Sequence, residues 1–319
     1  MKKLALSLIA LGIALILAGV LVPVIAPSST STPLTTTWPL EITDDHGRTV
    51  NIAETPERIV SLAPSITEIL FALDLGDKVV GVTDYCDYPE ELVEKIETGE
   101  TQRIGAPFPS FNLEIIVDLM PDIAFAIGAT VPDYVDDLVG LGIPTIILQP
   151  EIIDDIFHDI ELVGIIVGKQ GDAAALVADL EDDIDEIVAK VANAPVQSVF
   201  YGVDVSDPAM LWTVGNGTFI DDLITLAGGD NIAGNLEGWP TYNLEDLVNS
   251  NPDVIVLGGA NWGVSAEEVA SRPIWQDLDA VKNGNIYAID DTTLVRPGPR
   301  IANGLELLAG LIHPEFFGY

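Results

Sequence analysis

The sequence predicts an α/β fold of two lobes that are joined by a single long α-helix. Short apolar runs alternate with helix-like segments along the chain, which is typical of parallel α/β layers. One helix-and-strand unit occurs twice, as FNLEIIVDLMPDIAFA and YNLEDLVNSNPDVIVL, and its glutamates, Glu114 and Glu245, are offset by 131 residues, about one domain length. Between the two copies, a 3.6-residue apolar period predicts the joining helix.

The first lobe is expected over residues 40–171. It opens with LEITDDHGRTVNI, which predicts a β-hairpin because Gly47 can adopt the positive φ of the turn. RIVSL, SITEILFAL and KVVGV then predict a strand, a helix capped by Ser65 or Thr67, and a second strand. NLEIIVDLM with IAFAI, and YVDDLVGLG with TIIL, predict two further helix-and-strand pairs.

The joining helix is expected over residues 172–194, where apolar side chains recur at helical spacing before Pro195. The second lobe, residues 195–319, restarts the pattern with the strand SVFYGV and a helix in GTFIDDLITLAGG. The repeated unit, the strand KNGNIYAID and one closing helix in RIANGLELLAGLIHPEFF follow. The chain therefore predicts two Rossmann-like lobes of similar construction.

Residues 1–27 are predicted to be a signal or an N-terminal membrane anchor. Two lysines precede 23 uncharged, mostly apolar residues that end at Ala26 and would span about 34 Å as a helix. Pro27 disfavours cleavage after Ala26, so an uncleaved anchor is preferred to a cleaved signal, and the single cysteine, Cys86, is too distant to carry an N-terminal lipid. Residues 28–39, rich in Ser, Thr and Pro, are then an extended tether, and the rest of the chain is expected outside the cell.

Composition and motifs argue against several functional classes. The net charge of −37, from 50 acidic and 13 basic residues, argues against nucleic-acid binding. The glycine clusters VGNGTFI and GKQGD lack the dinucleotide and Walker patterns. The three histidines have no metal-ligand spacing, and the lone cysteine allows no internal disulfide and has no basic partner nearby in sequence. We therefore expect no enzymatic activity, no metal site and no permanently bound cofactor.

The run RIVSLAPSITEILFALDLGDKVVGVTDYCDYPEEL, residues 58–92, resembles the N-terminal motif of the helical-backbone substrate-binding proteins of ABC importers. Within that family it is most similar to the cobalamin-binding branch and more distantly to the iron–siderophore branch. NLEIIVDLMPDIAFA, LGIPTIIL and the tail WQDLDAVKNGNIYAIDDTTLVRPGPRIANGLELLAGLIHPE extend the resemblance over nearly everything from about Leu40 onward. It implies a ligand cleft between the lobes, delivery of a small molecule to an ABC permease dimer with its ATPase, and an extracytoplasmic monomer that is surface-anchored, secreted or periplasmic.

By matching motifs, the resemblance places five residues at the ligand cleft: Tyr85, Phe108, Trp212, Trp239 and Arg296. Flat aromatic side chains suit a planar macrocycle, and a few polar groups suit its amide fringe. Two alternatives stay open. Any one of the aromatics could be a core residue, and Arg296, like Arg300, could form a salt bridge with a nearby carboxylate.

Cobalamin or a related corrinoid is the expected ligand. Anionic siderophore complexes call for clustered basic residues, and this chain has few. A ferric siderophore or haem is the alternative within the family. An anchored sensor or adhesion scaffold with this fold is the alternative from another class.

Glu114 and Glu245 have a local explanation, because Asn112 and Asn243 can cap their helices and a first-turn glutamate stabilises the positive end of the helix dipole. The resemblance adds that these glutamates match the pair, one per lobe, that docks onto arginines of the two permease subunits. One carboxylate per lobe suits a two-fold symmetric partner. We therefore expect both glutamates at the permease-docking surface.

Overall fold

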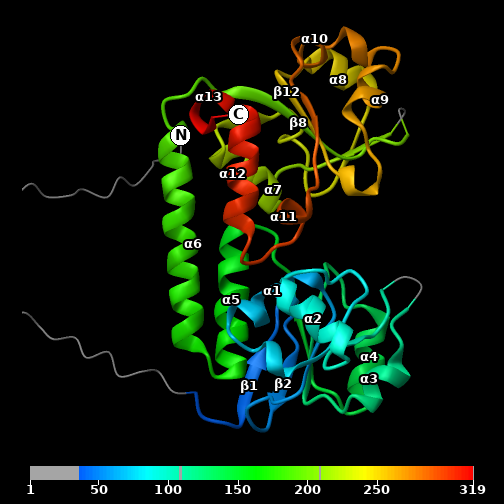
Figure 1. Cartoon of the computed structure of the whole chain (residues 1–319), viewed down its shortest axis with the longest axis vertical. Coiled ribbons are helices and arrows are strands. Elements are labelled where there is room, and N and C mark those ends of the chain that lie inside the picture. Colours follow the sequence, from blue (N-terminus) through cyan, green and yellow to red (C-terminus); the bar gives the residue numbers. More distant parts are fainter. Residues whose placement is uncertain (1–35, 108–109, 208–209, 319) are drawn as a thin grey trace, which may run out of the picture. The chain divides into compact units, whose positions relative to one another are not determined.

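The computed structural model describes residues 36–107, 110–207 and 210–318, which belong to one compact unit of the chain. Within this unit, two α/β lobes are joined by the long helix α6 (Gln170–Val191), as the sequence predicts (Figure 1). The expected signal or anchor, most of the expected tether and Phe108 lie outside the described residues. None of the helices in the described part is both long and apolar enough to cross a membrane.

An antiparallel hairpin precedes the N-terminal lobe. Its strands are β1 (Leu40–Thr43) and β2 (Thr49–Ile52), and Gly47 in the turn has a φ of 70°, as the hairpin prediction requires. The turn is fixed to the lobe because Asp45 Oδ2 accepts a hydrogen bond of 2.6 Å from the Gln149 backbone N–H. His46 Nε2 lies 2.8 Å from the carbonyl oxygen of Gly128.

The N-terminal sheet has five parallel strands in the order β5 (Gln102–Arg103), β4 (Val79–Val82), β3 (Ile59–Ser61), β6 (Ile123–Ile127) and β7 (Thr145–Leu148). Its helices are α1 (Pro64–Ala72), α2 (Glu90–Thr98), α3 (Leu113–Asp118), α4 (Asp133–Gly140) and α5 (Ile153–Val167), with the 3₁₀ turn η1 (Gly76–Lys78). The winding direction changes between β3 and β6. In such sheets, ligands bind outside the carboxyl ends of the strands at this change.

The C-terminal sheet has six strands in the order β11 (Thr241–Tyr242), β9 (Leu211–Thr213), β8 (Gln197–Asp204), β12 (Val254–Leu257) and β13 (Ile286–Ala288), with β10 (Gly229–Asn231) also on β8. β9 pairs antiparallel with β8 and β11, whereas β10, β12 and β13 join by parallel pairing. The helices are α7 (Phe219–Leu226), α8 (Leu244–Ser250), α9 (Ala266–Ala270), α10 (Asp279–Asn283), α11 (Thr292–Val295), α12 (Ile301–Ile312) and α13 (Pro314–Phe317), with the 3₁₀ turns η2 (Ala260–Trp262) and η3 (Trp275–Asp277).

Helix capping agrees with the sequence in the repeated unit and differs from it at α1. Asn112 Oδ1 accepts a hydrogen bond from an N–H of α3, and Asn243 Oδ1 does the same for α8, at 3.2 and 2.8 Å. The predicted Ser65 or Thr67 cap is wrong, because α1 begins at a proline after Ala63, and the Thr67 hydroxyl instead bonds within the core. The predicted closing helix is likewise divided, since α13 starts anew at Pro314.

One apolar core runs through both lobes. It joins the inner face of each sheet to α5, α6 and α12, and representative members are Ile59, Phe125, Val163, Ile184, Val256 and Leu305. A second cluster fills the other face of the N-terminal sheet, and a third fills the other face of the C-terminal sheet. The lobes therefore share buried apolar surface in addition to the covalent link through α6.

Candidate ligand cleft

A cavity of about 640 Å³ lies between loops of the two lobes, a size that is typical of small-molecule sites. The N-terminal lobe contributes residues 127–129, at the carboxyl end of β6, and residues 149–151, after β7. The C-terminal lobe contributes residues 216–219, residues 237–239, and two residues that flank Arg296. The loops that line the N-terminal side thus follow the carboxyl ends of β6 and β7, as the general rule for open α/β sheets requires.

Trp239 is the predicted aromatic residue that lines this cavity, and 46% of its surface is exposed. Its ring lies 6.3 Å from that of Phe219 in an edge-to-face arrangement. Backbone hydrogen bonds hold its loop, since Gly215 N–H donates to Gly238 O at 2.8 Å and Gly238 N–H donates to Asn216 O at 2.9 Å. A Cβ at Gly215 would collide with a backbone carbonyl, so this close approach requires glycine.

The polar lining of the cavity is acidic. Glu151 from the N-terminal lobe and Glu237 from the C-terminal lobe are its charged members, and no Lys, Arg or His is found among the described residues that line it. Gln149 and Asn216 add neutral amides, one from each lobe. The arrangement offers hydrogen bonds and an aromatic face, and it offers no positive charge to an anionic ligand.

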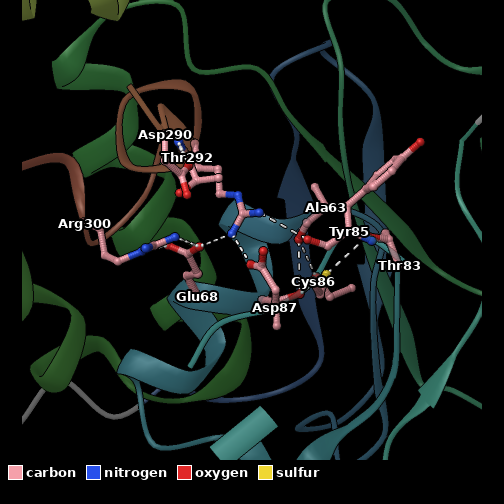
Figure 2. A network of polar contacts seen from close by, with 12 residues as sticks. Ala63, Glu68, Thr83, Tyr85, Cys86, Asp87, Asp290, Thr292 and Arg300 are labelled. Carbon is pink, nitrogen blue, oxygen red and sulfur yellow. Dashed lines mark hydrogen bonds and ion pairs between the residues drawn. The ribbon is translucent and has the colours of Figure 1, made fainter. Parts of the chain in front are cut away.

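Arg296 lies beside the cavity, and its guanidinium is bound to the N-terminal lobe. Nη1 lies 3.1 Å from Glu68 Oε1 and 2.6 Å from Asp87 Oδ1, and Nη2 donates to the Tyr85 carbonyl oxygen at 3.2 Å. Arg300 donates two hydrogen bonds to the same glutamate, from Nε to Oε2 at 2.9 Å and from Nη2 to Oε1 at 2.6 Å (Figure 2). Two arginines of the C-terminal lobe thus bind one buried glutamate of the other lobe. Arg296 and Arg300 therefore both form the salt bridges that the sequence analysis left open as an alternative to ligand contact.

The charge of Arg296 is retained in this setting. Burial lowers the pKa of its guanidinium, whereas hydrogen bonds and charge from Asp87 and Glu68 raise it, and the carboxylates prevail. Arg300 also lies over the Tyr88 ring, 4.2 Å from its centroid, which adds a cation–π contact. The guanidinium of Arg296 is thus engaged by protein groups, and its predicted contact with ligand stays a prediction.

Tyr85 and Trp212 are exposed over 45% and 52% of their surface, so neither is a core residue. Neither lines the 640 Å³ cavity. The Tyr85 ring extends away from Glu68 in Figure 2. Trp212 lies in β9 and pairs with Thr241, a residue that follows Trp239 by two positions. Their contact with ligand remains a prediction.

Cys86 is buried and follows Tyr85 directly in the group of residues drawn in Figure 2. Its Sγ lies 3.2 Å from the hydroxyls of both Thr67 and Thr83. Burial raises the pKa of the thiol. A buried thiol of raised pKa is a poor nucleophile.

Five polar residues of the cavity are not among the predicted cleft residues: Gln149, Glu151, Asn216, Thr218 and Glu237. The first two follow the strand TIIL directly, so the carboxyl-end rule could have identified them. Glu237 has no signal of its own beyond its place two residues before Trp239.

Glu114 and Glu245 occupy equivalent positions in the first turns of α3 and α8, one in each lobe (Figure 1). Both side chains are exposed. Within the described part of the chain, neither has a hydrogen bond or an ion pair, so both carboxylates are available to a partner.

Comparison with known proteins agrees with this architecture. The sequence profile of the periplasmic binding protein family matches residues 59–293. The uncharacterized ABC transporter substrate-binding lipoprotein YvrC of Bacillus subtilis (strain 168) is 33% identical over 311 residues, covering 95% of each chain. The vitamin B12-binding protein of Vibrio cholerae is 29% identical over 257 residues, covering 78% of this chain and 87% of that one. The solved structure of the periplasmic heme-binding protein RhuT from Roseiflexus sp. RS-1 has a TM-score of 0.71 at 26% identity, covering 82% of this chain and 99% of that chain.

Proposed function

The chain belongs to the periplasmic binding protein family, and from this premise we propose that it captures cobalamin, or a related corrinoid, and delivers it to the permease of an ABC importer. Members of the family are solute-binding transport proteins rather than enzymes. They work outside the cytoplasm with a permease and an ATPase. The protein is therefore an extracytoplasmic substrate-binding protein of an ABC transporter, and the proposal concerns its ligand and its docking surface.

The charge of the cleft is the observation that carries the choice of ligand. Glu151 and Glu237 face the cavity without a basic side chain among the described lining residues, and Arg296 is already bound to carboxylates. A catecholate siderophore or the propionates of haem would bring more negative charge into this site at an electrostatic cost. The neutral amide fringe of a corrin can instead bond with Gln149 and Asn216 while Trp239 contacts its flat face. Similarity to vitamin B12-binding proteins supports the same choice.

Haem or a ferric siderophore is the second candidate. RhuT, whose structure is similar to this chain with a TM-score of 0.71, is a heme-binding protein. The fold therefore accommodates heme in at least one relative. The two candidates differ in the charge that they require of the cleft, and direct binding measurements can separate them.

Replacement of Trp239 tests the ligand assignment. We expect wild-type protein to bind cyanocobalamin in isothermal titration calorimetry, and Trp239→Ala to weaken binding about tenfold, or about 1.4 kcal/mol, through loss of the aromatic contact. Trp262→Ala is the matched control, because Trp262 is 78% exposed in the same lobe and does not line the cavity. Binding of haem or a ferric siderophore without binding of cobalamin would overturn the assignment.

Charge reversal tests the docking surface. The double variant Glu114→Arg/Glu245→Arg is expected to abolish uptake of ligand in cells that carry the cognate permease, with ligand affinity unchanged, because both carboxylates are exposed at the start of their helices. Glu94→Arg/Glu181→Arg, which reverses two other exposed helical glutamates, is the control. Normal uptake by the first variant, or loss of its ligand binding, would contradict the docking role.

A further inference from the structure

An ion-pair cluster of four charged side chains lies between the lobes, next to the ligand cleft. The C-terminal lobe contributes Arg296 and Arg300, and the N-terminal lobe contributes Glu68 and Asp87. Figure 2 shows Glu68, Asp87 and Arg300 with their contacts. Two guanidinium groups thus meet two carboxylates, and the cluster is electrically neutral only while both carboxylates are present.

Arg296 adjoins the wall of the cleft through its neighbours in the chain. Val295 and Pro297, on either side of it, both line the 640 Å³ cavity. Its guanidinium is bound to the N-terminal lobe, where Nη1 contacts both carboxylates and Nη2 donates to the Tyr85 carbonyl oxygen. No Lys, Arg or His is found among the described residues that line the cavity. Among the described residues, Arg296 is therefore the basic side chain that directly adjoins the lining in sequence.

The two carboxylates of the cluster differ in their partners and in their exposure. The Glu68 side chain is 1% exposed and accepts two hydrogen bonds from Arg300, at 2.9 and 2.6 Å, so it keeps a cationic partner without Arg296. The Asp87 side chain is 64% exposed, and its Oδ1 lies 2.6 Å from Arg296 Nη1. Since Arg300 already balances Glu68, the charge of Asp87 is the one that offsets the charge of Arg296.

The loop that carries Asp87 is held by contacts that do not involve Arg296. The Thr83 carbonyl oxygen accepts a hydrogen bond of 3.2 Å from the Cys86 N–H. The buried Cys86 Sγ lies 3.2 Å from the hydroxyls of two threonines. Arg103 Nη1 donates to the Asp84 carbonyl oxygen at 2.8 Å. The N-terminal lobe therefore presents the Asp87 carboxylate to the arginine from a loop that its own contacts fix.

We propose that Asp87 is a specificity-determining residue, which disfavours anionic ligands in the cleft by neutralising Arg296. A carboxylate bound to the guanidinium occupies its donors and offsets its positive charge. An anionic ligand then meets Glu151 and Glu237 in the cavity without a compensating cation, whereas these charges do not oppose a neutral ligand. The inference rests on the proposed function for the identity of the neutral ligand and adds the residue that sets the preference for its charge.

The variant Asp87→Asn tests this role, because asparagine keeps an oxygen that can accept from Arg296 and removes only the charge. Isothermal titration calorimetry at pH 7 compares cyanocobalamin with its monocarboxylate, in which one side-chain amide is hydrolysed to a carboxylate. We expect the affinity for the monocarboxylate, relative to that for cyanocobalamin, to rise about threefold to tenfold in Asp87→Asn. Added KCl should reduce this gain, since salt screens the charges.

Asp84→Asn is the matched control. Asp84 is an exposed aspartate of the same loop, and its replacement changes the net charge of the protein by the same amount. It offsets no arginine of the cluster, so the relative affinity for the two corrinoids should stay at the wild-type value. The double variant Asp87→Asn/Arg296→Gln should lose the gain, because the uncompensated positive charge is then absent.

Haemin, which carries anionic propionates, separates this inference from the ligand assignment. If the wild-type protein binds haemin instead of cyanocobalamin, the corrinoid assignment fails, and Asp87→Asn should still bind haemin about threefold to tenfold more tightly than the wild type. An unchanged preference in Asp87→Asn would overturn the proposal for either ligand. An equal gain in Asp84→Asn, or a gain that persists without Arg296, would also overturn it, since either result would show an effect of net charge alone.

Discussion

Asp159 makes the stability of this protein depend on pH. Its pKa is 3.8 as an ordinary aspartate and about 9 in the folded state, where burial and the charge of Asp45 disfavour ionisation. Between these values the folded state holds a proton that the unfolded state has lost. The resulting contribution to stability is present in full below about pH 4 and is lost as pH rises to about 9, by at most about 1.4 kcal/mol per pH unit.

We expect Asp159→Asn to remove this dependence. Urea unfolding at several values between pH 5 and pH 9 should give a free energy of unfolding that falls more steeply with pH in the wild type than in the variant. The difference between the two proteins isolates Asp159 from the other carboxylates, whose contributions cancel. Parallel curves would show that Asp159 is ionised in the folded protein.

At the scale of single residues, the sequence predicts chemistry better than location. Trp239 was identified by its motif and lines the cleft, whereas Glu151 was not identified although it lines the same cleft. Arg296 was assigned to ligand, yet its guanidinium binds Glu68 and Asp87, which lie more than 200 residues away in sequence. Which groups meet across the lobes is decided by tertiary packing, and a local motif carries no information on it.

At the scale of elements, the contact between α5 and α6 depends on one glycine. A Cβ on Gly164 would lie well inside van der Waals distance of the Ala173 Cβ, and 3.2 Å from the Lys169 carbonyl oxygen. The two helices therefore approach closely at this point because Gly164 has no side chain. A methyl group at this position would overpack the contact and push the two helices apart.

We expect Gly164→Ala to lower the free energy of unfolding by about 1–3 kcal/mol, through overpacking. Gly171→Ala is the matched control, because Gly171 lies in α6 with open space around it. That variant should raise the free energy of unfolding by about 0.5–1 kcal/mol, the ordinary gain of alanine over glycine in a helix. Denaturant titration measures both, and equal effects of the two substitutions would contradict the close contact.

Element boundaries were predictable where one face of the element is exposed. The predicted helix over 172–194 corresponds to α6, because its outer face is polar and its inner face apolar. No bounds were predicted for α5, since most of its side chains are buried and no clean helical period results. Two-residue strands such as β5 and β11 form through pairing with a neighbour, so no local pattern predicts them.

At the scale of the whole molecule, Glu68 links the lobes through charge. Its side chain is 1% exposed and is bound by Arg296 and Arg300, both of which belong to the other lobe. Removal of one partner from a buried ion pair leaves uncompensated charge, which is far more destabilising than loss of a surface pair.

Glu68→Ala is expected to lower the free energy of unfolding by about 3–5 kcal/mol, because Arg300 loses its carboxylate and Arg296 keeps only Asp87. Glu68→Gln keeps hydrogen-bonding groups at the same place and should have a smaller effect. Glu267→Ala, at an exposed glutamate of α9, is the control and should change stability by less than about 0.5 kcal/mol. If Glu68→Ala were as stable as this control, the ion pairs would not contribute to the fold.

The two-lobed plan was predictable because the repeated helix-and-strand unit recurs at about one domain length. The shared core was not, because Ile59 and Val256 belong to the same apolar cluster without any relation in sequence. A repeat in the sequence shows that two halves of the chain have similar folds. It does not show which residues of one half pack against the other.

This shared core has a consequence for transport turnover. Opening the molecule like a hinge would expose to water the apolar surface that α5, α6 and α12 bury against both sheets, at about 25 cal/mol for each Å². A permease that released the ligand by parting the halves would have to perform this work in every cycle. Displacement of the short loops that carry Glu151 and Trp239 leaves the core closed. Release of the ligand by displacement of these loops, with the shared core closed, therefore costs less free energy than opening the lobes. The binding protein would then be able to bind the next ligand without refolding its core.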